Sequence, residues 1–262
     1  MISIPKLNIN TQWLIPAATA IWAVWTWAAD RKRDRDDERA RIAALYVNPF
    51  VSACQDLQSR IYSILERGGL STLRKRYPDG SYAEETLYLI VRYFGWMVVV
   101  ERHGPYTQDP VVMRLMSSIS SAFAAASSAQ QVGPFNFFHP EQKDLGKLVM
   151  TTIVESDNLE PDTISCHEFK KRLALPPWSD SASVKETLEA LRSADDGGGI
   201  PGRDRLAEAQ THLVDLVGYI EAKEGYTLYQ GERKKCVTPT RLRAAASTHP
   251  RPRRRRGRVT VP

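Results

Sequence analysis

The sequence is poor in the residues that build disulfide frameworks and metal centres. Its 262 residues include three cysteines, Cys54, Cys166 and Cys236, and no two of them form a Cys-x-x-Cys pair. Their odd number and wide spacing argue against a disulfide-stapled or zinc-bound fold and fit a reducing compartment. The five histidines show neither a His-Glu-x-x-His motif nor another metal-binding spacing. We therefore expect no metal and no cofactor.

Phosphate-binding glycine loops are also absent. The stretch richest in glycine, GGGIPGRDR at residues 197–205, lacks the Lys-Ser/Thr pair of a P-loop and follows a predicted helix rather than a strand. This composition indicates a flexible connection between two helices. The acidic stretch 155–162 lacks the central glycine of an EF-hand and is predicted to be a solvated loop.

Charge of both signs is present, but it is distributed unevenly along the chain. Residues 1–41 carry a net charge of +2, residues 42–230 a net charge of −6, and residues 231–262 a net charge of +10. An acidic central region is therefore flanked by a mildly basic beginning and a strongly basic end. The overall charge of +6 reflects the end of the chain and says nothing about the fold.

One long stretch has no charge at all. Residues 13–29, WLIPAATAIWAVWTWAA, follow a short N-terminal segment, residues 1–12. As a helix they would extend about 25 Å, the lower limit for crossing a hydrocarbon core. Trp13 lies at one end and Trp22, Trp25 and Trp27 lie near the other, as expected for side chains that prefer the headgroup region. We predict a single transmembrane helix over residues 13–29.

The charges beside this stretch predict its orientation. The preceding 12 residues carry only Lys6, whereas Arg31, Lys32, Arg33 and Arg35 follow directly after it. A cleaved signal peptide has the opposite order. Because basic residues remain on the cytoplasmic side, we expect the N-terminus outside and the rest of the chain in the cytoplasm. A cleaved signal, an interfacial helix and a soluble-core helix are the alternatives. Residues 30–41 are predicted to form a charged helical stalk.

Residues 42–230 are predicted to form an all-α domain. Apolar residues recur at spacings of three and four, and three Ser-x-x-Glu capping boxes begin at Ser81, Ser165 and Ser183. The predicted helices cover residues 48–70, 81–104, 109–126, 140–155, 165–173, 183–194 and 203–225. The second of these contains LYLIVRYFGWMVVV, which is apolar on nearly all sides and is expected to be the central buried helix; a re-entrant membrane segment is the alternative. Phe135, Phe137 and Phe138 are predicted to plug the core.

Residues 231–262 are predicted to form a disordered polybasic tail, because they have almost no apolar periodicity and much Pro and Arg. The candidate polyanion-binding residues are Arg251, Arg253, Arg254, Arg255, Arg256 and Arg258. They suit phosphates of nucleic acid, anionic lipid headgroups or acidic protein surfaces, and a tail without a specific partner is the alternative. No aromatic residue is interleaved with them, so base stacking is not indicated.

These features favour a single-pass membrane protein that acts as a non-enzymatic interaction or scaffold protein, with an unknown protein partner. One alternative is a membrane-tethered protein that binds nucleic acid or anionic lipid through the tail. A further alternative is an enzyme with a site near His103 and His139. The turn at residues 102–109 carries several polar groups directly after the most apolar helix, and we expect any pocket between it and the 135–139 loop.

Overall fold

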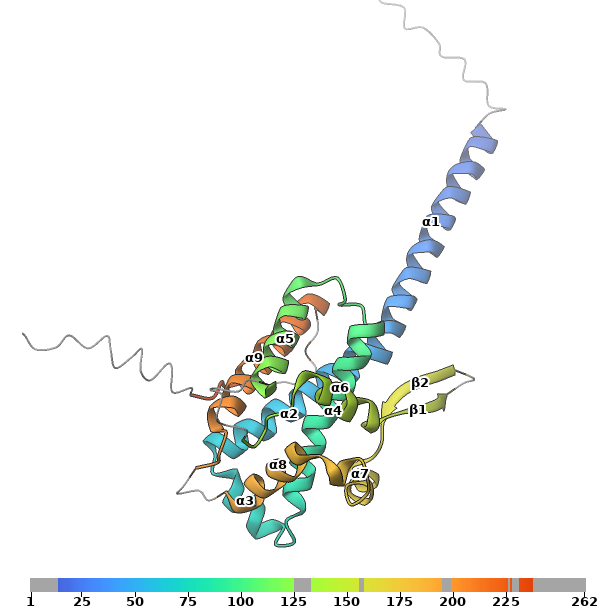
Figure 1. The fold of residues 1–262 in the computed structure, drawn as a ribbon. Coiled ribbons are helices and arrows are strands. Elements are labelled where there is room, and N and C mark those ends of the chain that lie inside the picture. Colours follow the sequence, from blue (N-terminus) through green and yellow to red (C-terminus); the bar gives the residue numbers. More distant parts are fainter. Residues whose placement is uncertain are drawn as a thin grey trace, which may run out of the picture. The chain divides into compact units, whose positions relative to one another are not determined.

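The computed structural model describes residues 14–124, 133–155, 158–194, 199–225, 227 and 231–237. The chain divides into two compact units, residues 1–45 and 46–262, which we call the N-terminal unit and the body. In chain order the elements are α1 (Leu14–Ile42), the π-helix η2 (Ala43–Val47), α2 (Asn48–Glu66), α3 (Gly69–Arg76), α4 (Ser81–His103), α5 (Pro110–Ala124), α6 (His139–Val149), β1 (Met150–Glu155), β2 (Asn158–Thr163), α7 (Cys166–Arg172), the 3₁₀-helix η3 (Trp178–Asp180), α8 (Ala182–Ser193) and α9 (Arg203–Glu224) (Figure 1). The described residues are mostly helical, which confirms the all-α prediction in its main outline.

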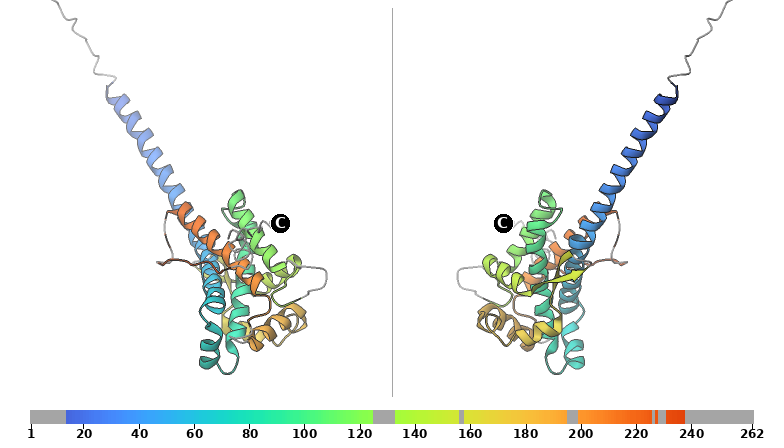
Figure 2. Two further views of the ribbon diagram at one scale, coloured as in Figure 1. Left: turned by 90° about the vertical axis from the view of Figure 1, so that its left-hand side faces the viewer. Right: turned by 90° about the vertical axis from the view of Figure 1, so that its right-hand side faces the viewer.

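Helix α1 is unbroken in both views of Figure 2, and its sequence changes from an apolar half to a charged half. The predicted stalk at residues 30–41 is therefore helical, and exposed pairs such as Asp30–Arg33, at 3.9 Å, lie along it. None of the described helices has both the length and the apolar character that a bilayer crossing requires. The prediction of a transmembrane helix over residues 13–29 thus finds no support in the helix itself, where alanine, threonine and tryptophan dilute the strongly apolar residues.

Helix α4 is the central helix of the body, as predicted, and it packs against α2, α6 and α8. Residues 98–100 lie within this helix, as predicted. The crossing with α6 is close because glycines face each other there. A Cβ atom on Gly146 would lie 2.7 Å from the backbone oxygen of Phe94, and one on Gly95 would lie 2.7 Å from Met150 Sδ. Any larger residue at Gly146 would therefore push the two helices apart.

The apolar stripes of α2 and α9 are buried as predicted. Phe50, Cys54, Leu57, Ile61 and Leu65 of α2, and Leu206, Leu213, Leu216, Val217 and Ile220 of α9, are all buried. Helix α9 packs against both α2 and α5. On α5, Leu115 is half-buried, whereas Val112, Met116, Ile119 and Phe123 are buried.

The segment between α5 and α6 supplies two of the three phenylalanines predicted to plug the core. Phe135 and Phe137 have no exposed surface, and Phe137 packs edge-to-face against Phe94, with ring centroids 5.6 Å apart. Phe135 adopts a φ of 60°, which is strained for a residue with a Cβ, and its N–H donates to Thr187 Oγ1 at 3.0 Å. The prediction is wrong for Phe138, whose side chain is 53% exposed. It precedes α6 directly and points away from the core.

A β-hairpin replaces the end of a predicted helix. The sequence predicts one helix over residues 140–155, but α6 ends at Val149 and β1 continues to Glu155. Strand β1 pairs antiparallel with β2, with Met150 opposite Thr163 and Thr152 opposite Pro161. The run Thr-Thr-Ile-Val is β-branched throughout, which disfavours a helix and favours a strand. The stretch 158–163 is likewise a strand rather than the predicted loop.

Helix starts follow the predicted capping boxes in one case of three. Ser165 caps α7, with its hydroxyl accepting from the Glu168 N–H at 3.2 Å. Helix α8 is capped by Ser181, whose hydroxyl accepts from the Val184 N–H at 3.1 Å, whereas Ser183 lies inside the helix. Helix α4 begins after the left-handed Gly80, and its first N–H, from Ser81, donates to Asp79 Oδ1 at 3.2 Å. Several residues satisfy the spacing of a capping box, and tertiary contacts decide which of them is used.

The beginning of the predicted tail belongs to the body. Residues 231–237 lie against α2 and α9, and Cys236 is 2% exposed. The prediction of a disordered tail starting at residue 231 does not hold for residues 233–236, because Arg233 and Lys235 pair with carboxylates of α9 and the backbone of Lys234 and Cys236 bonds to Gln210. Residues 238–262 lie outside the described residues.

Candidate functional site

The two units differ in the burial of their tryptophans. On α1, Trp22, Trp25 and Trp27 are 66%, 64% and 59% exposed. In the body, Trp96 and Trp178 are 1% and 2% exposed. Large aromatic side chains release free energy when they leave water, so three exposed tryptophans on one helix mark a surface that suits an apolar partner. Trp13, the fourth predicted anchor residue, lies outside the described residues.

The exposed tryptophans surround α1 rather than lining one side. At about 100° per residue, Trp22 and Trp25 point in similar directions, and their rings are 5.8 Å apart. Trp25 and Trp27 point to nearly opposite sides by the same rotation of about 100° per residue. Arg31 completes the group, because its guanidinium lies over the Trp27 ring at 4.6 Å from the centroid. The aromatic band is thus followed directly by a cation.

The residues of the enzyme hypothesis are placed at helix ends. His103 is the last residue of α4 and His139 is the first residue of α6, and both are exposed. Within the described part of the chain, no hydrogen bond joins the two histidines. His139 instead contacts Ser120 of α5, with 2.8 Å between Nδ1 and Oγ. The sequence did not single out Ser120, because no local motif joins it to His139.

The hydrogen bonds around Ser120 are oriented for packing. The Ser120 hydroxyl donates to Gln142 Oε1 at 2.6 Å, and Gln142 Nε2 donates to the backbone oxygens of Ser120 and Phe137. The two amide donors fix the orientation of Gln142, so the hydroxyl proton points at the amide oxygen. A general base must accept that proton. In this arrangement Ser120 accepts from His139, and the cluster joins α5 to α6.

The polar turn after α4 also serves the fold. Asp109 Oδ1 accepts from the N–H groups of Val111 and Val112, at 2.8 and 3.1 Å, and so caps α5. Its other oxygen accepts from Tyr219 at 3.1 Å and from Lys223. The hydrogen bond from Lys223, followed by the helix-capping bonds, lowers the pKa of Asp109 from 3.8 to about 2. One carboxylate therefore ties the start of α5 to the end of α9.

Charged residues on the central helices are paired. Arg92 of α4 lies 2.7 Å from Asp56 of α2. Glu85 is shared by Arg60 at 3.5 Å and Lys170 at 3.1 Å. Among the described residues, no group of three or more His, Cys, Asp and Glu side chains is placed to hold a metal ion.

The three cysteines are free thiols in different surroundings. Burial raises the pKa of the Cys54 thiol far above its usual value and raises that of Cys236 to about 12. Burial also raises the pKa of Cys166, which is half-buried at the start of α7. A raised pKa suppresses the thiolate, so these surroundings do not activate a nucleophile.

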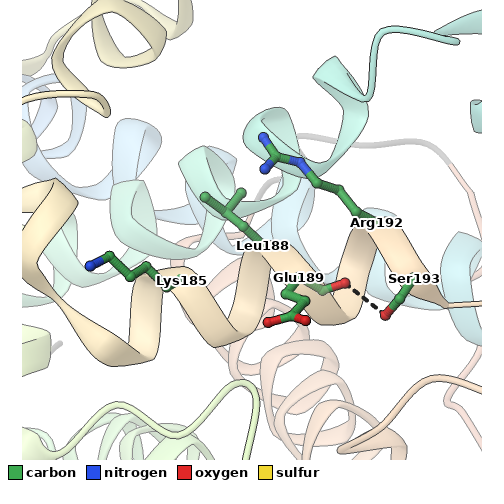
Figure 3. Close-up of a pocket in the computed structure, with 5 residues that line it drawn as sticks. All are labelled: Lys185, Leu188, Glu189, Arg192 and Ser193. Carbon is green, nitrogen blue, oxygen red and sulfur yellow. Dashed lines mark hydrogen bonds between the residues drawn. The ribbon is translucent and has the colours of Figure 1, made fainter.

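Among the surface hollows of the body, two lie beside α6 and α8. One, of about 480 Å³, is lined by Lys185, Leu188, Glu189, Arg192 and Ser193, all from α8, and Ser193 donates to the Glu189 backbone oxygen at 2.7 Å (Figure 3). Because a single helix supplies its lining, it cannot enclose a ligand. The other, of about 650 Å³, lies between α6 and the segment before α8, with an apolar lining from Leu145, Leu148 and Pro177 and carboxylates from Glu141 and Asp144.

Comparisons with known proteins give no family and no relative. No protein-family model matches the chain, and neither a curated protein nor a solved structure is similar to it. The functional argument therefore depends on the residues themselves. The six arginines from Arg251 to Arg258 that the sequence proposes for polyanion binding lie outside the described residues.

Proposed function

We propose that this protein is held at a membrane by its tryptophan-rich segment, residues 13–29, and acts there as a non-enzymatic interaction protein. The observation that carries the proposal is the exposure of Trp22, Trp25 and Trp27, at 59–66%, in a chain whose other described tryptophans are at most 2% exposed. A bilayer interface accommodates such side chains, because the ring leaves water while the indole N–H remains hydrated.

The distribution of these tryptophans around α1 favours insertion over lying flat. A helix that lies on a membrane surface needs a continuous apolar face with a polar face opposite. Trp25 and Trp27 point to nearly opposite sides of the helix, which suits a segment surrounded by lipid at that depth. In its more specific form, the proposal is that this segment crosses the membrane once, with the N-terminus outside. The basic residues Arg31, Lys32, Arg33 and Arg35 and the body then lie on the cytoplasmic side.

The hollow beside α6 supports an interaction role for the body. Its apolar lining, with Leu148 and the exposed Pro177, suits an apolar side chain of a protein partner, while Asp144 is already paired with Lys147 at 3.1 Å. Leu175, 57% exposed, is close in sequence to this surface. The basic sequence after residue 238 adds a second membrane contact in this proposal, since each Lys or Arg near an anionic leaflet contributes about 1 kcal/mol.

Flotation of the full chain with lipid vesicles tests the membrane proposal. We expect the chain to float with vesicles and the Trp22→Ala/Trp25→Ala/Trp27→Ala variant to lose about 100-fold or more of its partition coefficient, because each ring buries 150–250 Å². A matched control replaces Asp34, Asp36 and Asp37 with Asn, which changes the same helix without touching the aromatic band. If the wild-type chain stays at the bottom of the gradient, the proposal is wrong.

Expression in cells with a reporter at each end, followed by a carbonate wash, tests the single-pass form. Retention in the washed membranes with a protease-protected C-terminus is the expected result. Release by carbonate from a chain that floats with vesicles would leave membrane binding intact and overturn insertion. For the interaction role, Leu148→Asp should abolish capture of a partner from detergent extract, whereas Lys143→Asp on the exposed side of α6 should not.

A further inference from the structure

The segment Gly231–Val237 lies in a groove between α2 and α9. Side chains of these two helices bind it in the way that a protein binds an extended peptide. It turns back after α9 and runs antiparallel to that helix: Arg233 contacts Glu221, Lys235 contacts Asp215, and Cys236 contacts Gln210. The last described residue, Val237, donates its N–H to Glu66 of α2 at 3.4 Å. The segment forms no helix and no strand, and side chains of α2 and α9 contact it from Arg233 to Val237.

Two basic side chains of the segment meet carboxylates of α9. The Arg233 guanidinium donates to both oxygens of Glu221, at 2.7 Å each, and to Gln55 of α2 at 2.6 Å. Arg233 and Glu221 are 12% and 8% exposed, so this two-pronged pair is largely shielded from water. Lys235 lies 2.5 Å from Asp215 in a more exposed position. The side chain of Lys234, between them, is exposed.

A buried glutamine forms hydrogen bonds with the backbone of the segment. Gln210, with no exposed surface, donates from Nε2 to the Lys234 backbone oxygen at 2.9 Å and accepts at Oε1 from the Cys236 N–H at 2.9 Å. Its amide thus imitates a neighbouring strand, with one donor and one acceptor to the same peptide. Nε2 also donates to Gln58 of α2 at 3.3 Å, which keeps the amide oriented. Beside it, Cys236 is buried as the apolar end of the segment.

We propose that the groove between α2 and α9 is a binding site for an extended basic peptide, and that Arg233–Val237 are its exchangeable occupant. The groove supplies what such a site requires: carboxylates for an arginine and for a lysine two residues later, an amide that pairs with any backbone, and a buried position for a small apolar side chain. A partner segment with the same pattern, an arginine followed two residues later by a lysine and then by a small apolar residue, satisfies every contact. The inference is independent of membrane binding, because no residue of α1 takes part.

Thiol labelling of the wild-type chain tests whether the occupant leaves the groove in the folded protein. Cys54 and Cys236 are both buried, but Cys54 belongs to the core face of α2, whereas Cys236 belongs to the segment. Under native conditions with iodoacetamide, we expect Cys236 to react at least tenfold faster than Cys54, with half-buried Cys166 as the fast reference. Equal rates for Cys236 and Cys54 would mean that the segment leaves only on global unfolding, and would overturn the proposal.

Binding of a peptide in trans tests the groove itself. The probe is a fluorescent heptapeptide, Gly-Glu-Arg-Lys-Lys-Cys-Val, added to the full-length Arg233→Asp/Lys235→Asp variant, whose own segment is repelled by Glu221 and Asp215. We expect binding at least tenfold tighter than to the wild-type chain, where the tethered segment competes at an effective concentration on the order of millimolar. The matched control is Lys234→Asp, which reverses an exposed charge and should behave as wild type.

Adding Glu221→Gln to the double variant should weaken binding of the peptide at least tenfold, because the arginine loses its charged partner. Absence of peptide binding to a double variant that keeps its helical circular dichroism would overturn the proposal. So would a double variant that fails to fold, since it would make the segment an integral part of the core.

Discussion

The described tryptophan side chains are exposed in the N-terminal unit and buried in the body. Trp96 and Trp178 are enclosed by the body, where Trp178 meets Phe169 edge-to-face at 5.0 Å, whereas the tryptophans of α1 are mostly exposed. In the body an aromatic ring stabilises the fold by leaving water on folding. On α1 it leaves water only when a partner arrives. The difference separates residues that determine stability from residues that determine location, and substitutions can test that separation.

The largest expected effect is on the body side of the comparison. Trp96→Ala should lower the free energy of unfolding by about 3–5 kcal/mol, because it leaves a cavity in the centre of α4. Urea denaturation followed by circular dichroism measures this. Trp96→Phe should lose much less, since the Trp96 N–H is buried without a hydrogen-bond partner. A loss below about 1 kcal/mol for Trp96→Ala would contradict the tight packing described for α4.

Helical glycines sharpen the comparison between close packing and open surface within the body. Gly146→Ala should lower the free energy of unfolding by about 1–3 kcal/mol, because its Cβ meets the backbone of α4. Gly218 of α9 is the matched control, with nothing within 4 Å of its Cβ position. Gly218→Ala should raise stability by about 0.5–1 kcal/mol. Equal effects of the two substitutions on the midpoint of thermal unfolding would contradict the close crossing of α4 and α6.

The carboxylate of Asp109 makes the stability of the body depend on pH. Its pKa is lowered from 3.8 to about 2 in the folded state, so its contribution to stability is complete above about pH 4 and is lost as the pH falls toward 2. Asp109→Asn keeps a helix cap but loses the contact with Lys223, and should flatten this part of the stability–pH profile. Asp109→Ala should also lower the free energy of unfolding by about 1–3 kcal/mol at neutral pH. An unchanged acid profile in Asp109→Asn would contradict the assignment.

The smallest effect on stability is expected on α1. Trp25→Ala should change the free energy of unfolding of the body by no more than about 0.5 kcal/mol, because the ring is 64% exposed. The same denaturation experiment, run beside vesicle flotation, separates stability from membrane binding. A large loss of stability would show that Trp25 belongs to the packed structure and would remove the contrast between the two units.

Helical periodicity predicted the core faces of the body well. The stripes of α2 and α9 and the burial of α4 follow from spacings of three and four. Apolar residues at these spacings lie on the same face of a helix, and that face packs against the core. The hairpin was missed because the apolar pattern of residues 140–155 fits a helix in its first part, and only the β-branched run Thr151–Val154 signals the change. Phe138 was misplaced because its burial depends on where α6 begins, which a local pattern does not determine.

Contacts between residues far apart in the chain could not be predicted from the sequence. Gln210, Glu221 and Asp215 are ordinary residues of an amphipathic helix, and nothing in their spacing connects them with residues 231–237. Charge counting even pointed the other way, because Arg233, Lys234 and Lys235 blend into a basic stretch that composition alone assigns to solvent. The hydrogen bonds between Ser120 and Gln142 were not predicted for the same reason. Buried polar groups find their partners through the fold, and the partners have no fixed offset along the chain.

The order of the elements along the chain also determines the order in which they are synthesised. The groove between α2 and α9 is filled by a segment that follows both helices, so during synthesis the helices emerge first and the segment last. The packed helices therefore pass through a period in which Gln210 and Glu221 are without Cys236 and Arg233. A nascent chain that has not yet reached Arg233 presents the groove without its own segment, so the site is fully open to a basic peptide in that period and is in competition with the tethered segment afterwards.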